Sequence, residues 1–215
     1  MAVHFQYGTT EIDHLKRVDK RLGAVIEQIG IIERAVIPDL FTALVHSIVG
    51  QQISTKAHNT IWERMETTLG RITPATIDSL SQEELQRFGI TFKKADYIKS
   101  VARKIIAGEL DLDALLSMPD EVVCAELSRL DGIGVWTAEM LMIFSMQRPD
   151  VLSYGDLAIL RGLRMVYHHR KIDKALFNKY RKRYSPYASV AGLYLWAVAG
   201  GAIDEMKDYA SKKKK

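Results

Sequence analysis

The most informative stretch of this chain is Leu130-Asp131-Gly132-Ile133-Gly134-Val135-Trp136-Thr137-Ala138. Two glycines flank one residue here, so the backbone can adopt positive φ and pass close to another backbone. From Val135 to Met146 the residues are apolar on nearly every face, which predicts a central, buried helix directly after the turn. The first amides of a helix lack partners within it, and such an end attracts phosphate. The stretch therefore predicts a phosphate-binding turn between two helices.

Helical periodicity dominates the sequence on both sides of this turn. Apolar residues form one helical stripe over 12–29, and further stripes lie over 40–49, 57–65, 98–106 and 122–127. Ser54 and Ser81 occupy helix N-cap positions, and Glu84 completes a capping box with Ser81. We read 70–74 as a linker and expect three last helices over 156–167, 174–184 and 186–199. Because only residues 3–7 alternate as a strand does, we predict an all-α fold of roughly ten short helices.

The composition argues against disulfide-linked, four-cysteine cluster and membrane-spanning proteins. Cys124 is the only cysteine, which excludes disulfides within the chain and any cluster that needs four thiolates. No apolar run reaches membrane-spanning length, and residues 1–7 do not read as a signal peptide. With 47% apolar and 26% charged residues, the chain resembles an ordinary soluble globular protein. We therefore expect a cytoplasmic protein that does not enter a membrane.

Positive charge is concentrated locally although the body of the chain is balanced. The net charge of +4 comes from the four lysines at 212–215, since the other 26 of the 30 basic residues match the 26 acidic ones. Residues 161–184 contain nine lysines and arginines against Asp173 alone, and residues 93–104 contain five against Asp96. Such clusters suit a polyanion lying on one face, or they are simply solvated helix faces. The lysine tail is either a phosphate-seeking arm or a solubility tail.

Four residues or pairs could carry chemistry, and each has a plain structural alternative. Asp156 begins a helix after an apolar run, where an acid serves as an N-cap or as a reactive carboxylate. Trp136 is either core or a surface that stacks on a base. Gln51-Gln52 is a solvated turn or a contact at a helix junction, and Tyr187 is a packed aromatic or part of a site. The six histidines show no metal-ligand spacing, and the chain has no P-loop, GxGxxG or GxSxG motif.

Four segments arrive in an order that resembles the helix-hairpin-helix DNA glycosylases, specifically the bacterial 3-methyladenine DNA glycosylase II (AlkA-like) group. They are Ile48 to Ser54, Gly89 to Ile98, the glycine hairpin with Trp136-Thr137-Ala138, and Asp156, twenty residues after Trp136. The ending from Ser185-Pro186-Tyr187 to Trp196 is also similar to the family's. The resemblance implies two helical lobes, 38–148 and 1–37 with 149–215, with an active-site cleft between them.

The resemblance further implies a monofunctional DNA glycosylase of base excision repair. It would flip alkylated purines of the 3-methyladenine and 7-methylguanine type out of double-stranded DNA and hydrolyse the N-glycosidic bond. Asp156 would be the catalytic carboxylate, in a protein that acts as a monomer. The base pocket would be formed by Trp136, Met140, Leu157 and Tyr187. DNA would be bound by Gln51, Gln52, Ile53, Gly132, Ile133, Gly134, Thr137, Lys93 and Lys94.

The same resemblance sets expectations for cofactors. No cofactor is required, but Na⁺ or K⁺ would sit at the hairpin on the backbone carbonyls of Ser128, Leu130 and Ile133. The missing cysteines exclude the iron–sulfur branch of the superfamily. Trp136 stands where bifunctional members carry a nucleophilic lysine, so no lyase activity is expected. Such an enzyme would work on the nucleoid in a bacterial cytoplasm, or in the nucleus of a eukaryote.

Three departures from the family pattern leave alternatives open. Asp131 replaces the usual hairpin proline, Leu157 replaces an aromatic after the acid, and Ala188 replaces an arginine. Because Leu157 and Ala188 alter the expected pocket, a glycosylase for deaminated bases such as hypoxanthine or uracil is a second hypothesis. A non-catalytic helix-hairpin-helix module that binds DNA is a third.

Overall fold

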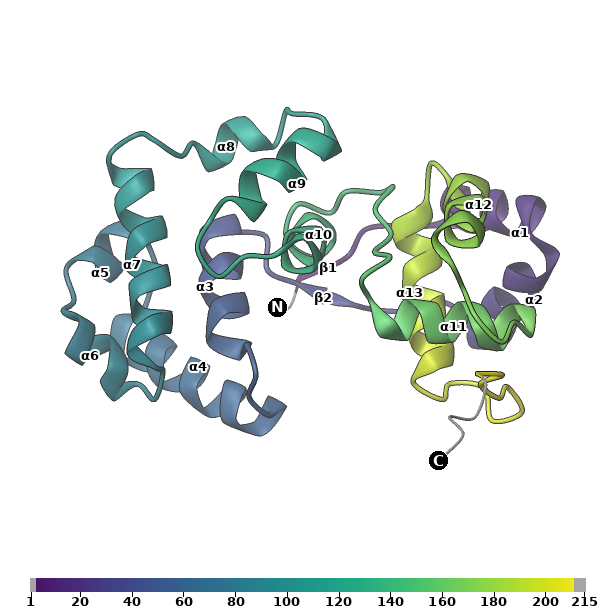
Figure 1. Cartoon of the computed structure of the whole chain (residues 1–215), viewed down its shortest axis with the longest axis horizontal. Coiled ribbons are helices and arrows are strands. Elements are labelled where there is room, and N and C mark those ends of the chain that lie inside the picture. Colours follow the sequence, from purple (N-terminus) through teal and green to yellow (C-terminus); the bar gives the residue numbers. More distant parts are fainter. Residues whose placement is uncertain (1–2, 211–215) are drawn as a thin grey trace. The chain divides into compact units, whose positions relative to one another are not determined.

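The computed structural model describes residues 3–210, so the Lys212–Lys215 tail lies outside the described residues. These residues form thirteen α-helices and one two-stranded sheet, which confirms the all-α prediction (Figure 1). The chain divides into two compact units. Unit 2 is Ile37–Met146, and unit 1 combines the chain before it with the chain from Gln147 onward. The predicted lobe 38–148 differs from unit 2 by one residue at its start and two at its end.

Unit 1 is built on the buried helix α13 (Ala188–Ala199). Gly162 of α11 lies so close to α13 that a Cβ there would stand 2.3 Å from the Leu195 carbonyl oxygen. Its small sheet pairs Val3 with Val36 and His4 with Ala35 in antiparallel register. The elements of unit 1 are β1 (Val3–His4), α1 (Thr9–Val18), α2 (Lys20–Ile29), β2 (Ala35–Val36), α11 (Leu157–Tyr167), α12 (Lys174–Tyr184) and α13 (Ala188–Ala199).

Unit 2 surrounds the apolar helix α3, in which Leu44, Val45, Ile48 and Val49 are all buried. As predicted, Ser54 caps α4 and Ser81 forms a capping box with Glu84 at the start of α6. The elements of unit 2 are α3 (Leu40–Gly50), α4 (Thr55–Leu69), α5 (Pro74–Asp78), α6 (Gln82–Arg87), α7 (Phe92–Ile106), α8 (Leu112–Leu115), α9 (Asp120–Ser128) and α10 (Val135–Phe144).

Two expectations about single elements were wrong, and one element was not foreseen. The stripe over 12–29 is two helices, because Asp19 adopts extended backbone and caps α2 by accepting the Arg21 and Leu22 amides. The stretch read as a linker ends in α5, which Thr73 caps and Pro74 begins. Strand β2 was not foreseen, since two residues are too short to show an alternating pattern.

The helix after the hairpin also differs from its prediction. Helix α10 ends at Phe144, and its first turn is open to solvent, with Val135 59% and Trp136 49% exposed. Only Ala138, Leu141, Met142 and Ile143 are buried. Because apolar residues are spread evenly around α10, the sequence did not reveal that the first turn of this helix is exposed. No helix among residues 3–210 is both long and apolar enough to cross a membrane.

Candidate functional site

The hairpin between α9 and α10 is a tight turn in which the two glycines have different roles. Gly132 has φ +80°, and a Cβ on it would lie 2.4 Å from the ring of Tyr97. The turn closes through the Ile133 amide, which donates to the Leu130 carbonyl at 3.0 Å. Gly134 has φ −88°, and a Cβ there would meet nothing within 4 Å. Only Gly132 therefore requires the left-handed backbone conformation that favours glycine, whereas Gly134 leaves the space beside its Cα open.

That open space lies at the start of α10. Gly134 is the N-cap, and no side chain caps the helix. The first amides of a helix carry partial positive charge, and an N-terminus without a side-chain cap is suited to a phosphate oxygen. Because the first turn of α10 is exposed, a polyanion can reach these amides. The turn that the sequence predicts to bind phosphate thus ends in an exposed helix start without a side-chain cap.

The α3–α4 turn lies beside the hairpin and is bonded to it. Gln51 donates from Nε2 to the Gly132 carbonyl at 2.7 Å. Gln52 has φ +55° and is exposed, and Ile53 is exposed as well. The sequence grouped these three residues as one DNA contact. In the structure Gln51 links the turn to the hairpin, and Gln52 and Ile53 lie at the surface, so contact of all three with DNA stays a prediction.

A histidine pair supports the same turn from the other side. The rings of His46 and His58 have centroids 4.1 Å apart, and the rings of His46 and Trp62 form a T-shaped pair. A Cβ at Gly50 would stand 2.8 Å from the His58 ring, so the backbone of the turn rests on that imidazole. Burial lowers the pKa of His46 to about 4 and also lowers the pKa of His58. Both rings are therefore neutral packing groups near pH 7.

Helix α7 supports both the turn and the hairpin. Lys94 donates from Nζ to the carbonyls of Val49 and Gln51 at 2.9 and 2.7 Å, and burial lowers the pKa of its ammonium group. Tyr97 lies under Gly132, and Ser100 donates to Asp131 at 3.4 Å. The sequence predicts that Lys94 binds DNA, which stays a prediction; in the structure its ammonium donates to carbonyls at the end of α3. The signal for this scaffold was the spacing of residues 94, 97 and 100, which recur every three positions along one helix.

Lys93 and Lys94 should consequently respond differently to the same substitution. We expect Lys94→Met to lower the free energy of unfolding by about 1–3 kcal/mol, because two carbonyls lose a charged donor. Lys93 is exposed, with its ammonium 5.7 Å from the centroid of the Tyr97 ring, so Lys93→Met should cost less than about 1 kcal/mol. Urea unfolding monitored by circular dichroism measures both. Equal stability of the two variants would contradict the role given to Lys94.

Asp156 is both a helix cap and a buried carboxylate. Its Oδ1 accepts the amides of Ala158 and Ile159 at 2.8 and 3.0 Å at the start of α11. The residue is only 7% exposed, and Leu157 beside it is 81% exposed. The two amides orient the carboxylate rigidly. The two interpretations of Asp156, a helix N-cap and a reactive carboxylate, are thus compatible. Capping holds the carboxylate in place and does not prevent it from taking part in a reaction.

The four predicted pocket residues are divided between the units. Leu157 and Tyr187 belong to unit 1, where Tyr187 presents its ring to the edge of His14 at a centroid distance of 5.2 Å. Trp136 and Met140 belong to unit 2, and both are on α10. Each unit therefore contributes one exposed apolar side chain beside a feature suited to DNA chemistry, Leu157 at the carboxylate and Trp136 at the hairpin.

The hairpin also contains the carbonyls expected to hold a monovalent cation. The Leu130 carbonyl already accepts the Ile133 amide, which leaves it one lone pair. Among the described residues, no hydrogen bond reaches the carbonyls of Ser128 or Ile133. No group of three or more His, Cys, Asp or Glu in that part of the chain could hold a metal ion. Carbonyl oxygens are the ligands that hard cations prefer, so the donor set fits the expected ion.

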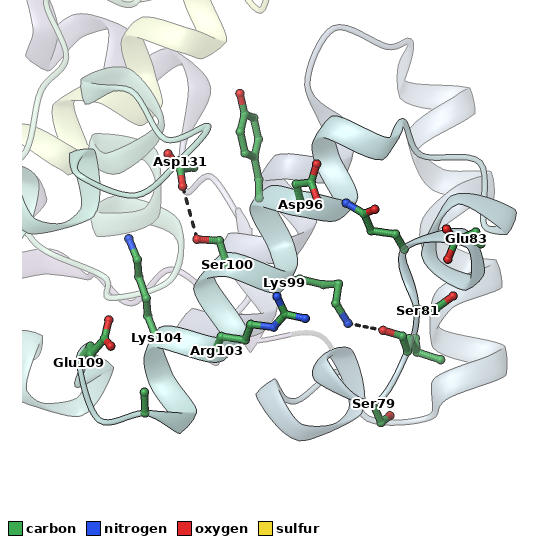
Figure 2. Close-up of a pocket in the computed structure, with 14 residues that line it drawn as sticks. Ser79, Ser81, Glu83, Asp96, Lys99, Ser100, Arg103, Lys104, Glu109 and Asp131 are labelled. Atoms are coloured by element: carbon green, nitrogen blue, oxygen red, sulfur yellow. Dashed lines mark hydrogen bonds between the residues drawn. The ribbon is translucent and has the colours of Figure 1, made fainter.

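A cavity of about 1190 Å³ opens on α7 and the segment before α6 (Figure 2). Two of its cations are already engaged: Lys99 bonds to the carbonyls of Asp78 and Leu80, and Arg103 pairs with the Asp78 carboxylate at 3.0 Å. Asp131 of the hairpin lies at its edge. The cavity is lined by polar and charged groups and contains neither Asp156 nor Trp136. It is a polar surface groove and does not resemble a base pocket.

A glycine hairpin with an uncapped helix start, in an all-helical fold with a buried carboxylate at the start of α11, defines a helix-hairpin-helix protein. A family model described as HhH-GPD superfamily base excision DNA repair protein matches residues 45–186. The chain therefore belongs to the HhH-GPD superfamily of base excision DNA repair proteins. This confirms the family expected from the four ordered segments.

Individual relatives are similar over most of the chain. DNA-3-methyladenine glycosylase 1 of Schizosaccharomyces pombe is 30% identical over 161 residues, which cover 73% of this chain and 71% of that protein. A crystal structure of a DNA-3-methyladenine glycosidase from Bacillus halodurans has a TM-score of 0.86 and 36% identity, covering 96% of this chain and 97% of the other. A Schizosaccharomyces pombe 3-methyladenine DNA glycosylase in complex with abasic DNA has a TM-score of 0.78 and 26% identity, covering 93% and 100%.

Proposed function

We propose that this protein is a monofunctional DNA glycosylase that removes alkylated purines, of the 3-methyladenine and 7-methylguanine type, in base excision repair. The observation that carries the proposal is Asp156, a buried carboxylate fixed by two amides in a chain of the HhH-GPD superfamily. The relatives named DNA-3-methyladenine glycosylase support the choice of alkylated purines.

The chemistry follows from the charge that develops as the base leaves. Breaking the N-glycosidic bond builds positive charge on the deoxyribose, and a fixed anion stabilises that charge. The Asp156 carboxylate would supply the anion and orient the attacking water. An alkylated purine is already cationic, so it leaves without a general acid. Its charge also favours stacking on an electron-rich ring such as Trp136 or Tyr187.

Double-stranded DNA would be held by unit 2. The amides that follow Gly134 would bind a backbone phosphate, with Na⁺ or K⁺ on the neighbouring carbonyls sharing its charge. Gln52 and Ile53, which are exposed on a turn bonded to the hairpin, would fill the gap left by the flipped base. Flipping costs a few kcal/mol, and less for a damaged pair. We expect a monomer that needs no other cofactor and works where the cell keeps its DNA.

The wild-type protein should release free 3-methyladenine and 7-methylguanine from alkylated duplex DNA and leave the strand intact. Trp136 has no nucleophilic amine, so no Schiff base with the sugar can form there. Chromatography of the released bases tests the first statement. Borohydride trapping on a lesion duplex tests the second, with a lysine-dependent bifunctional glycosylase as the positive control. A trapped protein–DNA adduct would refute the monofunctional assignment.

A glycosylase for deaminated bases is the second candidate, and the exposed aliphatic Leu157 favours it. An aliphatic side chain beside the carboxylate offers less to a cationic base than an aromatic ring would. The same duplex format with hypoxanthine or uracil as the lesion separates the two candidates. If no lesion releases a base although the duplex is bound with a steep dependence on salt, the protein is a non-catalytic binding module.

A further inference from the structure

A second carboxylate, Asp150, joins three parts of unit 1 that are distant in the sequence. Its Oδ2 accepts the Ser185 hydroxyl at 2.6 Å, and its Oδ1 accepts the Ala188 amide at 3.2 Å. Its backbone carbonyl accepts Nη2 of Arg181 at 3.2 Å. Asp150 therefore ties the chain that leads to α11 to the last turn of α12 and the first residue of α13.

Ser189 reinforces the same junction from inside the core. It is fully buried, and its hydroxyl donates to the Arg148 carbonyl at 2.6 Å while accepting the Val151 amide at 2.9 Å. Its own amide donates to the Pro149 carbonyl at 3.0 Å. Residues 148–151 are thus bonded along their length to the start of α13. Neither Asp150 nor Ser189 belongs to the residues that would touch DNA.

From this junction the chain reaches Asp156 with little freedom. Val151, Leu152 and Ser153 are buried, and a Cβ at Gly192 of α13 would meet the Leu152 side chain at 3.3 Å. Two exposed residues then lead into Asp156. Residues 151–155 form a short link whose two ends, Asp150 and Asp156, are both held by hydrogen bonds. A shift of the backbone at Asp150 would therefore displace the chain close to the carboxylate of Asp156.

The other arm of the junction leads to Tyr187. Ser185, which donates to Asp150, also accepts Nε2 of His14 at its carbonyl, at 3.0 Å. The His14 ring meets the Tyr187 ring edge-on at 83°. In the sequence, Tyr187 lies between Ser185 and Ala188, the two residues that donate to the Asp150 carboxylate. The Asp150 side chain therefore sets the positions of both arms.

We propose that Asp150 is a positioning residue that holds Asp156 and Tyr187 at a fixed spacing for excision of the base. This inference rests on the proposed glycosylase activity, although the mechanical link from Asp150 to Asp156 can be measured without it. Asp150→Asn is the informative change, because it keeps the size of the side chain but replaces one accepting oxygen with a donor.

The experiment compares Asp150→Asn with Asp173→Asn in the full-length protein. Asp173 is a matched control, since it caps α12 in the same unit by accepting the Leu176 amide at 2.8 Å and has no bond to the junction. In Asp150→Asn, we expect the amides of Ala158 and Ile159 to exchange hydrogen about tenfold faster or more. The Leu176 amide should not change in that variant. Asp173→Asn should leave all three amides as in the wild type, because asparagine caps a helix as well as aspartate does.

Activity supplies the second measurement. With saturating enzyme, Asp150→Asn should release the base about tenfold to a hundredfold more slowly, because a small misplacement of the reacting groups is costly. Its affinity for an abasic duplex should stay within about twofold of the wild type, since in the proposed function unit 2 would hold the duplex through the hairpin. A merely structural role would reduce the rate only in proportion to the folded fraction and would spare the capped amides.

The outcomes are separable. Unchanged exchange at Ala158 and Ile159 in Asp150→Asn would overturn the inference while leaving the proposed function intact. Equal loss of activity in the two variants would overturn it as well. If the wild type releases no base, the proposed function fails, and the role in excision fails with it. Faster exchange at both amides together with slower excision would support the inference.

Discussion

Asp156→Asn should release alkylated purines from duplex DNA about 100- to 1000-fold more slowly than the wild type, while folding normally. The magnitude is that of removing one preorganised electrostatic group from a transition state. Folding should survive, because asparagine is as good an N-cap as aspartate and its carbonyl oxygen can accept the Ala158 and Ile159 amides. The change therefore removes the negative charge and keeps the cap. Single-turnover release of 3-methyladenine measures the rate, and thermal unfolding measures the fold.

Two further variants separate chemistry from capping. Asp156→Ala should lose the same activity and also about 1 kcal/mol of stability, because two helix amides lose their acceptor. Asp39→Asn changes another helix cap, at the start of α3, where Oδ1 accepts the Thr42 amide at 2.7 Å. It should retain the wild-type rate. Full activity in Asp156→Asn would show that the acid is only a cap.

The fold was predictable where local chemistry determines it. Ser54, Ser81 and Asp156 are caps by residue type and position, and each begins the helix expected of it. Asp19 shows the limit of such reasoning. Leu15 and Leu22 continue one helical phase across it, so periodicity joined two helices that a buried acid separates. The bond from Asp19 to Arg183, at 2.6 Å, spans 164 positions and has no local signal.

The sequence named candidate site residues, but it did not reveal the contacts that these residues make in the fold. Lys94 and Lys93 look alike in the sequence, but one has buried carbonyls within reach and the other does not. The side-chain amide of Gln51 donates to a carbonyl 81 positions away, a contact with no local signal. Asp150 received no role, because its partners follow it by more than 30 positions. Contacts that are distant in sequence set these roles, and a single sequence does not reveal them.

The second large effect concerns the two hairpin glycines, whose substitution by alanine should change stability by different amounts. Gly132→Ala should lower the free energy of unfolding by at least about 2 kcal/mol, because alanine is strained at φ +80° and its methyl group would overlap the Tyr97 ring. Gly134→Ala should cost less than about 1 kcal/mol, since its φ is ordinary and the space around it is open. Urea unfolding separates the two variants.

Binding to an abasic duplex should fall in both variants, by about tenfold or more, because both alter the approach of phosphate to the start of α10. Gly108→Ala is the matched control for backbone strain. Its φ is +73° in the same unit, but no atom lies within 4 Å of the added Cβ and it is far from the hairpin in sequence. Wild-type affinity in Gly134→Ala would rule out phosphate binding there. If Tyr97→Ala restores stability to Gly132→Ala, the clash with the ring accounts for most of the cost.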